Sequence, residues 1–393
     1  MKRVCILYSN WYNASNGASR FVKTLLCNKE PFSKEGVDFE VVSRDLINPR
    51  VFTNGASNSS KSRFKSLVSG FISKSSLLTI LYTFFIDERY NRQIVKTYLN
   101  KGMQHDAIHF QELDTCYYFL KYRSGKSHSK TFLTLHTNGQ DFSMLFLVKP
   151  AINSKLGRRY LNKRLNFVIK NVDRIGFVSK NSMETFAQNH PDVKDKLTFV
   201  YNGIKDVEPS SETRQNDVID LITVGTVCQR KNQRSILDAI GKLNEEEKTK
   251  IKLTVAGDGP DLPYLKEQVE KYHLSNIELL GNCLNVDDYL CKSNAFILPS
   301  LDEGLPISII EGMRRGLLIL GSNVAGIPEM IQNGESGYII DTSVESIVDS
   351  LRKLLQKKPE EIRMMGEKSR QLFLEKFLES LMIKQYAQEY LAL

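Results

Sequence analysis

Short apolar runs typical of buried β-strands alternate with helical patterns along the whole chain. Six such runs come before Asn202-Gly203, at residues 4–8, 39–42, 107–110, 131–136, 174–179 and 197–201. Six more follow, at residues 221–225, 252–256, 277–280, 295–298, 317–320 and 338–340. Strands that alternate with helices build parallel sheets from βαβ units. Because 393 residues exceed one ordinary core, the two series predict two doubly wound α/β domains.

The division between the domains is expected near Asn202-Gly203. A polar segment that contains proline and serine follows at residues 205–214, as is typical of a domain boundary. We therefore assign residues 1–203 to a first domain and residues 204–374 to a second. The helical pattern that closes the chain is interrupted near Leu378.

The composition, 41% hydrophobic and 25% charged, is that of an ordinary soluble globular protein. The longest apolar-leaning run, residues 77–86, is about half as long as the roughly 20 residues that span a bilayer, so no membrane span is expected. The apolar run at the N-terminus stops at Ser9-Asn10 without a cleavage site, which indicates a strand rather than a signal peptide. Six scattered cysteines lack zinc or Cys-x-x-Cys spacing, so we expect reduced thiols in a cytoplasmic protein.

The net charge of +9 is concentrated in two segments of the first domain. Residues 56–86 contain four basic residues and no acidic one. Residues 142–172 also lack acidic residues and contain seven basic ones: Lys149, Lys155, Arg158, Arg159, Lys163, Arg164 and Lys170. Such patches suit nucleic acid, an anionic membrane or an acidic small substrate. Nucleic acid is disfavoured, because no helix-turn-helix pattern or aromatic-interleaved basic sheet accompanies them.

The helical pattern from Lys155 to Val172 predicts one apolar side and one basic side. Leu156, Leu161, Leu165, Val168 and Val172 form the apolar side, and Arg158, Arg159, Lys163 and Arg164 form the basic side. We expect Lys155, Arg158, Arg159 and Lys163 to contact an acceptor or anionic lipid headgroups. An ordinary solvated basic face is the alternative.

The segment from Glu303 to Glu311, Glu-Gly-Leu-Pro-Ile-Ser-Ile-Ile-Glu, is the strongest indication of function. It follows a predicted strand and opens a helix, and Pro306 fits the first helical position. Backbone N–H groups at such a helix start bind anions such as phosphate. Glu311 would accept two hydrogen bonds from a ribose diol, and Glu303 would meet hydroxyls of a second sugar. This chemistry suits a nucleotide sugar.

Residues 221–340 resemble the nucleotide-binding half of the retaining GT-B glycosyltransferases of family 4. The resemblance is carried, in the family's order and spacing, by Leu221-Ile-Thr-Val-Gly225, Arg230-Lys231-Asn-Gln, Val255-Ala-Gly-Asp-Gly-Pro260, Ile297-Leu-Pro-Ser300, the Glu303/Glu311 pair, and Gly326-Ile-Pro-Glu329 with Asn333-Gly334 and Gly337. It implies two Rossmann-like domains that face each other across a cleft. The first would bind the acceptor and the second the nucleotide sugar, and a final helix, about residues 375–393, would pack back onto the first.

The resemblance also implies roles for residues of the second domain. Arg230 and Lys231 would stabilise the charge of the departing diphosphate. Glu311 would hold the ribose, Glu303 would hold the donor sugar's hydroxyls, and Asn282 would lie in the loop that meets the base. The remaining donor contacts would come from Gly304, Leu305, Pro306, Ile307 and Thr226, the last at a position where the family commonly has arginine. We interpret the Gly257-Asp-Gly259-Pro260 segment as a structural turn.

In the first domain, Asn16-Gly17-Ala-Ser-Arg20 resembles the family's Gly-Gly-Ala-Glu-Arg loop, and Gly17 would approach the donor phosphate. His136 ends a strand where the family carries a histidine close to the transferred sugar, and Asp141 is a weaker candidate. His105 and His109 flank a strand-like run, so we do not expect them to form a zinc site.

The implied function is the transfer of a hexose-type sugar, with retention, from a nucleotide diphosphate sugar to a glycan or lipid-linked acceptor. We expect uridine donors before guanosine donors, catalysis by His136, Arg230, Lys231 and Glu303, and no metal or other cofactor, since no Asp-x-Asp clamp is present. The expected setting is assembly of a bacterial surface polysaccharide, in the cytoplasm or at the inner face of the membrane.

Two other classes of protein share features with this sequence. Asn16, Thr226 and Lys205 depart from the family pattern and would permit a non-catalytic GT-B-like subunit that holds a glycan or another transferase. A nicotinamide-dependent dehydrogenase is disfavoured, because neither first strand is followed by a complete Gly-x-Gly-x-x-Gly.

Overall fold

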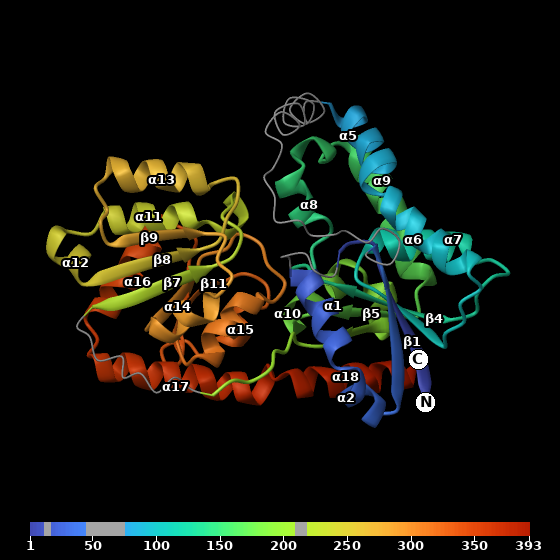
Figure 1. The fold of residues 1–393 in the computed structure, drawn as a ribbon. Coiled ribbons are helices and arrows are strands. Elements are labelled where there is room, and N and C mark those ends of the chain that lie inside the picture. Colours follow the sequence, from blue (N-terminus) through green and yellow to red (C-terminus); the bar gives the residue numbers. More distant parts are fainter. Residues whose placement is uncertain (12–16, 45–74, 209–217) are drawn as a thin grey trace. The chain divides into compact units, whose positions relative to one another are not determined.

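The computed structural model describes residues 1–11, 17–44, 75–208 and 218–393 (Figure 1). The chain divides into two compact units. The first unit consists of residues 1–178, 183–200 and 383–393, and the second of residues 179–182 and 201–382.

The first unit is built on a parallel six-stranded sheet with the order β2-β1-β3-β4-β5-β6. Its strands are β1 (Lys2–Tyr8), β2 (Val37–Ser43), β3 (Ala107–Phe110), β4 (Lys130–Leu135), β5 (Arg174–Phe177) and β6 (Leu197–Phe199). Its longer helices are α1 (Gly17–Cys27), α2 (Lys29–Lys34), α5 (Ser76–Tyr82), α6 (Arg89–Asn100), α7 (Leu113–Tyr122), α8 (Ser143–Val148) and α9 (Lys155–Asn171). Short turns η1 (Thr83–Asp87), η2 (Pro150–Ile152) and η3 (Pro191–Lys196) connect them. Two further helices, α10 (Lys180–Asn189) and α18 (Glu379–Ala392), begin in the second unit and end in the first.

The second unit carries another parallel six-stranded sheet, with the order β12-β11-β10-β7-β8-β9. Its strands are β7 (Ile219–Val224), β8 (Ile251–Ala256), β9 (Ile277–Gly281), β10 (Ala295–Leu298), β11 (Leu318–Ser322) and β12 (Gly337–Ile340). Its helices are η4 (Gln229–Lys231), α11 (Gln233–Gly241), α12 (Glu245–Thr249), α13 (Leu262–Lys271), α14 (Val286–Lys292), α15 (Ile307–Arg314), η5 (Ile327–Met330), α16 (Val344–Leu355) and α17 (Pro359–Lys376). Figure 1 shows α11, α13 and α16 on one face of this sheet and α14, α15 and α17 on the other.

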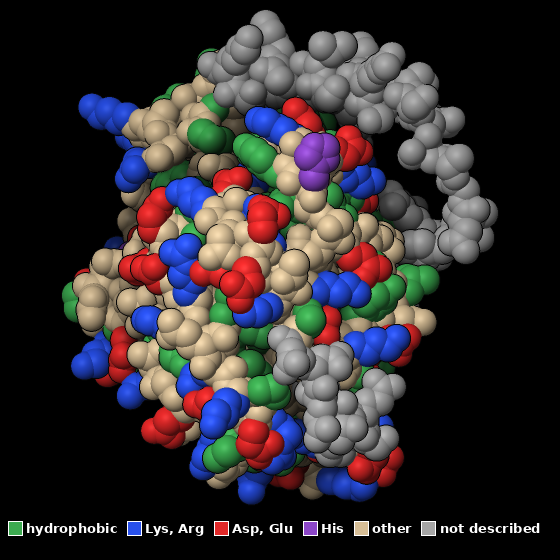
Figure 2. All heavy atoms as spheres, turned by 90° about the vertical axis from the view of Figure 1, so that its left-hand side faces the viewer, with side chains coloured by type: hydrophobic (Ala, Val, Ile, Leu, Met, Phe, Trp, Pro, Cys, Tyr) green, Lys and Arg blue, Asp and Glu red, His purple; other side chains and the backbone are tan. Residues whose placement is uncertain are grey.

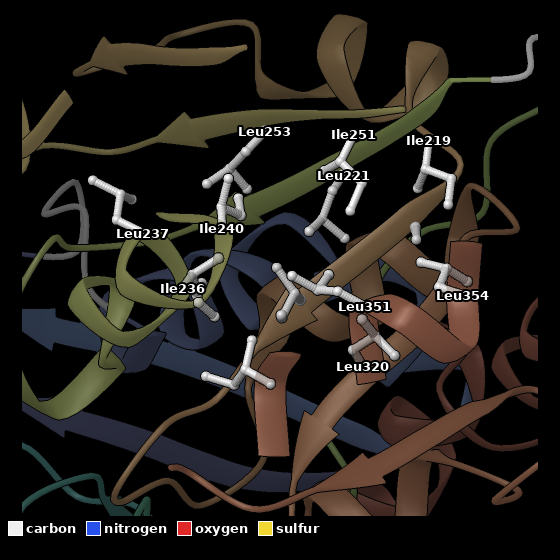
Figure 3. Packing of buried hydrophobic residues seen from close by; sticks show 14 of the residues in the cluster. Ile219, Leu221, Ile236, Leu237, Ile240, Ile251, Leu253, Leu320, Leu351 and Leu354 are labelled. Atoms are coloured by element: carbon white, nitrogen blue, oxygen red, sulfur yellow. The ribbon is translucent and has the colours of Figure 1, made fainter. Parts of the chain in front are cut away.

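The central strands are mostly apolar, because helices cover both faces of each sheet. All four residues of β10 are completely buried. In the second unit, Leu221 and Leu253 of the sheet pack with Ile236 of α11 and Leu351 of α16 (Figure 3). On the face shown in Figure 2, basic and acidic side chains are interspersed over most of the surface.

The strand order creates one switch point in each sheet. In the first unit, the chain turns one way from β1 and the other way from β3, and these strands are neighbours. In the second unit the same holds for β7 and β10. Open α/β sheets bind ligands outside the carboxyl ends of such neighbouring strands, because their connections leave in opposite directions.

All twelve predicted strands are present, with ends shifted by no more than two residues, and the predicted doubly wound α/β fold class is confirmed. The predicted interruption near Leu378 falls between α17 and α18. No helix in the described ranges is both long and apolar enough to cross a membrane. The four basic residues of the segment 56–86, which are Lys61, Arg63, Lys65 and Lys74, lie outside the described residues.

The predicted sides of α9 need correction. Arg164, predicted on its solvated side, is 5% exposed, and its Nη1 lies 2.6 Å from Glu88 Oε2 and 2.8 Å from Asp114 Oδ1. Leu156, predicted on the apolar side, is 52% exposed. The helical pattern alone shows which side chains share a face, but not that Glu88, just before α6, and Asp114 of α7 pair with a buried arginine.

Candidate functional site

The charged cluster of the second unit begins in the loop after β7. Gly225 donates its N–H to the Ala256 carbonyl at 3.0 Å, and the adjacent Gly257 approaches so closely that a Cβ there would lie 1.9 Å from the Gly225 oxygen. A Cβ on Gly259 would lie 2.3 Å from the Val227 oxygen. The two glycines therefore let the β8 loop pack directly on the β7 loop.

A short 3₁₀ turn, η4, then presents Arg230 and Lys231. Asn232, with a left-handed φ of 57°, ends this turn and allows α11 to begin at the next residue. The buried amide of Gln233 fixes the loop at two points, since its Nε2 donates to the Thr226 carbonyl and its Oε1 accepts from the Cys228 N–H. The two cations therefore lie on a restrained backbone.

Glu303, in the loop after β10, pairs with both cations. Its Oε1 lies 2.8 Å from Arg230 Nη1 and 2.6 Å from Lys231 Nζ. Arg230 also donates from Nη1 to the Asp302 carbonyl at 2.8 Å, and its own carbonyl accepts from Leu301 N–H at 2.8 Å. The carboxyl ends of β7 and β10, the neighbours at the switch point, thus supply the whole cluster.

Burial and charge oppose each other at Glu303, which is 6% exposed. Burial alone would raise the pKa of its carboxyl, but the charges of Lys231 and Arg230 outweigh that effect and hold the pKa below the ordinary value. The carboxylate is therefore ionised at neutral pH. Two cations and one anion leave an excess positive charge at this loop.

Helix α15 follows the cluster directly. Pro306 is its N-cap, with φ −71° and ψ 117°, and Ile307 is the first helical residue, so the predicted position of Pro306 is wrong by one residue. Gly304 is held by Gly326, whose N–H donates to its carbonyl at 3.0 Å. Leu305 is buried, and its carbonyl accepts from Asn202 Nδ2 at 3.0 Å.

Two buried polar side chains lie on α15. Glu311 is 9% exposed. The hydroxyl of Ser308, on the first turn, is buried and has no hydrogen-bond partner among the described residues. Because the first N–H groups of a helix also lack intrahelical partners, this end of α15 offers several donors to an anion. Sequence reasoning missed Ser308, although it lies inside the segment between the two glutamates.

Two further residues predicted to bind the donor substrate, Thr226 and Asn282, are less closely grouped with the cluster. Thr226 lies on the same loop as Arg230, and its side chain is exposed. Asn282 is also exposed and follows β9, which is separated from β7 by β8 in the sheet.

In the first unit, His136 directly follows β4. Its Nε2 lies 2.7 Å from Oε1 of Gln111, which follows β3, and Phe21 of α1 packs edge-on against its ring at 5.3 Å. Burial lowers the pKa of His136 to about 4, so the imidazole is neutral at pH 7. Gly17, the first residue of α1, is exposed, and Asn16 lies outside the described residues.

Two carboxylates of the first unit have structural partners. Asp141 accepts from His190 Nε2 at 2.9 Å. Glu112, which sequence reasoning missed, accepts from Ser9 N–H at 3.1 Å and from Asn10 Nδ2 at 2.9 Å, and so ties the β1 loop to the end of β3. Within the described ranges, no group of three or more His, Cys, Asp or Glu side chains could hold a metal ion.

The four basic candidates Lys155, Arg158, Arg159 and Lys163 are exposed on α9 and not among the loops that follow the strands. Arg158 donates from Nε to Asn153 Oδ1 at 2.8 Å, and its guanidinium lies 5.1 Å from the Phe146 ring.

These features define a two-domain α/β protein with one buried ionic cluster and one buried neutral cluster at strand ends. The family model described as "Glycosyltransferase Family 4" matches residues 33–207, and the model described as "Glycosyl transferases group 1" matches residues 205–372. The chain belongs to the family 4 glycosyltransferases with the GT-B fold, and the resemblance seen in the sequence is thereby confirmed.

Individual relatives agree with this assignment. The chain is 28% identical over 233 residues to the phosphatidylinositol N-acetylglucosaminyltransferase GPI3 subunit of Saccharomyces cerevisiae, covering 56% of this chain and 51% of that protein. It is 27% identical over 241 residues to N-acetyl-alpha-D-glucosaminyl L-malate synthase of Bacillus anthracis, covering 58% and 62%. The chain thus spans about half to three fifths of the length of these relatives. The crystal structure of Anabaena HepE in complex with UDP and glucose has the same fold, with a TM-score of 0.69, 14% identity and complete coverage of both chains.

Proposed function

We propose that this glycosyltransferase moves a hexose-type sugar from a uridine diphosphate sugar to a glycan or lipid-linked acceptor, with retention at the anomeric carbon. The observation that carries the proposal is the Arg230–Glu303–Lys231 cluster at the switch point, followed within four residues by the start of α15. A diphosphate is the ligand that two cations and a helix N-terminus suit together. Both relatives named above are N-acetylglucosaminyl enzymes by name, so UDP-N-acetylglucosamine is the first donor to test.

Glu303 suits sugar binding better than proton transfer. A general base works best with a pKa near the operating pH, whereas the two cations lower the pKa of this carboxyl. In the proposed step, the bond from the anomeric carbon to the diphosphate breaks while the acceptor oxygen bonds to the same face of the sugar. The acceptor's proton passes to the departing phosphate, whose charge Arg230 and Lys231 stabilise.

A thermal-shift screen with UDP, GDP and their sugars tests the donor, because a ligand that binds the native state raises the melting temperature. We expect a shift with UDP and UDP-N-acetylglucosamine that Glu311→Ala abolishes. The control is Glu335→Ala, which removes an exposed glutamate of the same unit. An unchanged shift in the Glu311 variant would overturn the ribose assignment.

Turnover separates an enzyme from a binding subunit. We expect the pure protein to release UDP from its donor and the product to keep the donor's anomeric configuration by proton NMR. We also propose that transfer needs no divalent metal, so EDTA should leave the rate unchanged. Binding without any release of UDP would favour the non-catalytic subunit instead.

We propose, further, that the first unit contacts an anionic membrane through the exposed face of α9. The four basic side chains there adjoin exposed apolar ones, because α5 packs against α9 and η2, and α8 packs against η2. The large exposed apolar residues of α5, of η1 (which contacts α5), of α8 and of α9 are Leu77, Leu78, Leu81, Phe85, Ile86, Leu147, Val148 and Leu156. Basic and apolar side chains on one face match the interface of an anionic bilayer.

Sedimentation with vesicles tests this contact. We expect binding to vesicles of phosphatidylcholine and phosphatidylglycerol, and loss of binding when Lys155, Arg158, Arg159 and Lys163 are all changed to alanine. The matched control changes four exposed lysines of the second unit, Lys242, Lys250, Lys266 and Lys271. Equal losses in both variants would indicate a non-specific charge effect and contradict the proposal.

A further inference from the structure

A continuous chain of hydrogen bonds runs from His136 to the last helix of the protein. His136 Nε2 lies 2.7 Å from Gln111 Oε1, and Gln111 Nε2 lies 3.0 Å from His109 Nε2. On the other side of its ring, His109 Nδ1 lies 2.7 Å from the hydroxyl of Tyr390 on α18. Three strand-associated residues are thus linked to a residue 281 positions from His109 in the sequence.

The amide of Gln111 gives this chain a direction. Its oxygen can only accept, so His136 carries its proton on Nε2, and its nitrogen can only donate, so Nε2 of His109 is the unprotonated nitrogen. His109 then carries its proton on Nδ1 and donates a hydrogen bond from there to the hydroxyl oxygen of Tyr390. Thr134 Oγ1, at 2.7 Å, can donate to the same Nε2 of His109.

Packing holds the two rings in place. His109 is completely buried and stacks on Phe132 at 4.7 Å, and Phe21 packs against both His109 and His136. Burial lowers the pKa of His109 to about 3, as it lowers that of His136 to about 4. Each neutral ring therefore has one donor and one acceptor nitrogen. No hydrogen bond to Nδ1 of His136 is found among the described residues.

We propose that Gln111 is a positioning residue, which holds His136 with its proton on Nε2 and so leaves Nδ1 as an acceptor for a hydroxyl of the sugar substrate. The proposal rests on the proposed function, together with the expectation from the family resemblance that His136 lies close to the transferred sugar. What the proposal specifies is the tautomer: here Nδ1 accepts a hydrogen bond from the substrate hydroxyl, whereas in the other tautomer Nδ1–H would donate to the hydroxyl oxygen. The link through His109 to Tyr390 makes the C-terminal helix part of this arrangement.

Nitrogen-15 NMR of the full-length protein with labelled histidine tests the tautomers without any substrate. In the wild type at pH 7, we expect a protonated Nε2 for His136 and a protonated Nδ1 for His109. A protonated Nδ1 on His136 in the wild type would overturn the proposal, whatever any variant does.

Two variants of Gln111 sharpen the test. In Gln111→Met, the preference of His136 should be lost. In Gln111→Glu, an acceptor still faces His136, so His136 should keep its tautomer, while His109 moves its proton to Nε2. The matched control is Gln268→Met, which replaces a buried glutamine of the second unit and should leave both histidine spectra unchanged. An unaltered His136 signal in Gln111→Met would show a merely structural role and reject the proposal.

Steady-state kinetics test whether the tautomer of His136 affects the rate of sugar transfer. We expect Gln111→Met to lower kcat/KM about tenfold, the scale of one hydrogen bond in a transition state, with the UDP thermal shift unchanged. Gln111→Glu should recover part of that loss. A changed tautomer with full transfer activity would reject the sugar contact of His136. Absence of transfer in the wild type would instead contradict the proposed function and leave the NMR result valid.

Discussion

The two units place polar side chains at the carboxyl ends of parallel strands, but with opposite electrostatics. In the second unit, Arg230 and Lys231 both pair with the Glu303 carboxylate, at 2.8 and 2.6 Å, and the three side chains together carry an excess positive charge. In the first unit, His109 and His136 stay neutral, the amide of Gln111 connects them, and the Tyr390 hydroxyl bonds to the far side of His109. A charged cluster suits a diphosphate, whereas a neutral one suits sugar hydroxyls.

The difference shows two ways to keep titratable groups buried. A buried charge must be paired, or the group must give up its charge. Glu303 keeps its charge because cations lower the pKa of its carboxyl, and His109 loses its charge because burial lowers the pKa of its ring. Each solution should respond differently to mutation and to pH.

The largest effect is expected from removing one cation of the ionic cluster. Lys231→Ala should lower kcat roughly 10²- to 10³-fold, the scale of losing one preorganised charge or donor at a transition state. The variant also leaves Glu303 with a single cationic partner in a buried site. Steady-state rates of UDP release measure the change.

Lys242→Ala is the matched control, because Lys242 pairs with Glu345 at 2.7 Å with both side chains exposed. An exposed ion pair contributes little, so its rate should equal that of the wild type within error. A Lys231 variant that keeps more than a tenth of the activity would break the comparison, since the ionic cluster would then be no more than structural.

The ionic cluster was readable from the sequence because its members lie in short segments at predicted strand ends. Strand periodicity located β7 and β10, and the spacing of Arg230, Lys231, Glu303 and Glu311 resembled a known family. The strand order was not readable, and it is the order that makes β7 and β10 neighbours.

The neutral cluster of the first unit could be predicted from the sequence only in part. His136 was found by resemblance, but no local pattern relates Gln111 and His109 to Tyr390, which lies more than 270 residues further along the chain. The prediction for Arg164 was wrong for a similar reason, since its carboxylate partners, Glu88 and Asp114, come from other segments of the chain. Side-chain partners that meet only through tertiary packing leave no signal in sequence periodicity.

A smaller effect should follow from disturbing the backbone beneath the ionic cluster. Gly257→Ala would place a Cβ 1.9 Å from the Gly225 carbonyl oxygen, so the β7 loop must shift. We expect a loss of about 2–4 kcal/mol in the free energy of unfolding, together with a weaker UDP thermal shift. Chemical denaturation followed by far-UV circular dichroism measures the first.

Gly241→Ala provides the control in the same unit. Gly241 ends α11, and a Cβ there meets no atom within 4 Å, so its stability should equal or slightly exceed that of the wild type. If both variants were equally stable, the close packing of the two loops would not be what holds Arg230 and Lys231 in place.

The smallest expected effect is a difference between the two units in how their stability depends on pH. Trp11, the single tryptophan, belongs to the first unit, so its fluorescence reports that unit's unfolding in urea. The pKa of His109 is about 3 in the folded protein and about 6.5 when unfolded. The unfolded state therefore binds the extra proton as pH falls below 6.5, and the stability from the neutral ring is lost progressively down to about pH 3.

Glu303 should act in a lower window. The folded pKa of its carboxyl lies below the ordinary value, so its stabilisation is complete above about pH 4.5 and is lost only as the pH falls further. Asp114, whose pKa burial raises to about 6, opposes the histidine effect in the first unit. A variant is therefore needed to isolate the contribution of His109.

Between pH 7 and pH 5, the wild type should lose about 2 kcal/mol more than His109→Gln in the unfolding free energy reported by Trp11. His128→Gln, which replaces an exposed histidine of the same unit, should follow the wild type. Equal pH dependence in the wild type and the His109 variant would mean that His109 is not held neutral by burial. The contrast between a neutral first unit and an ionic second unit would then lose its physical basis.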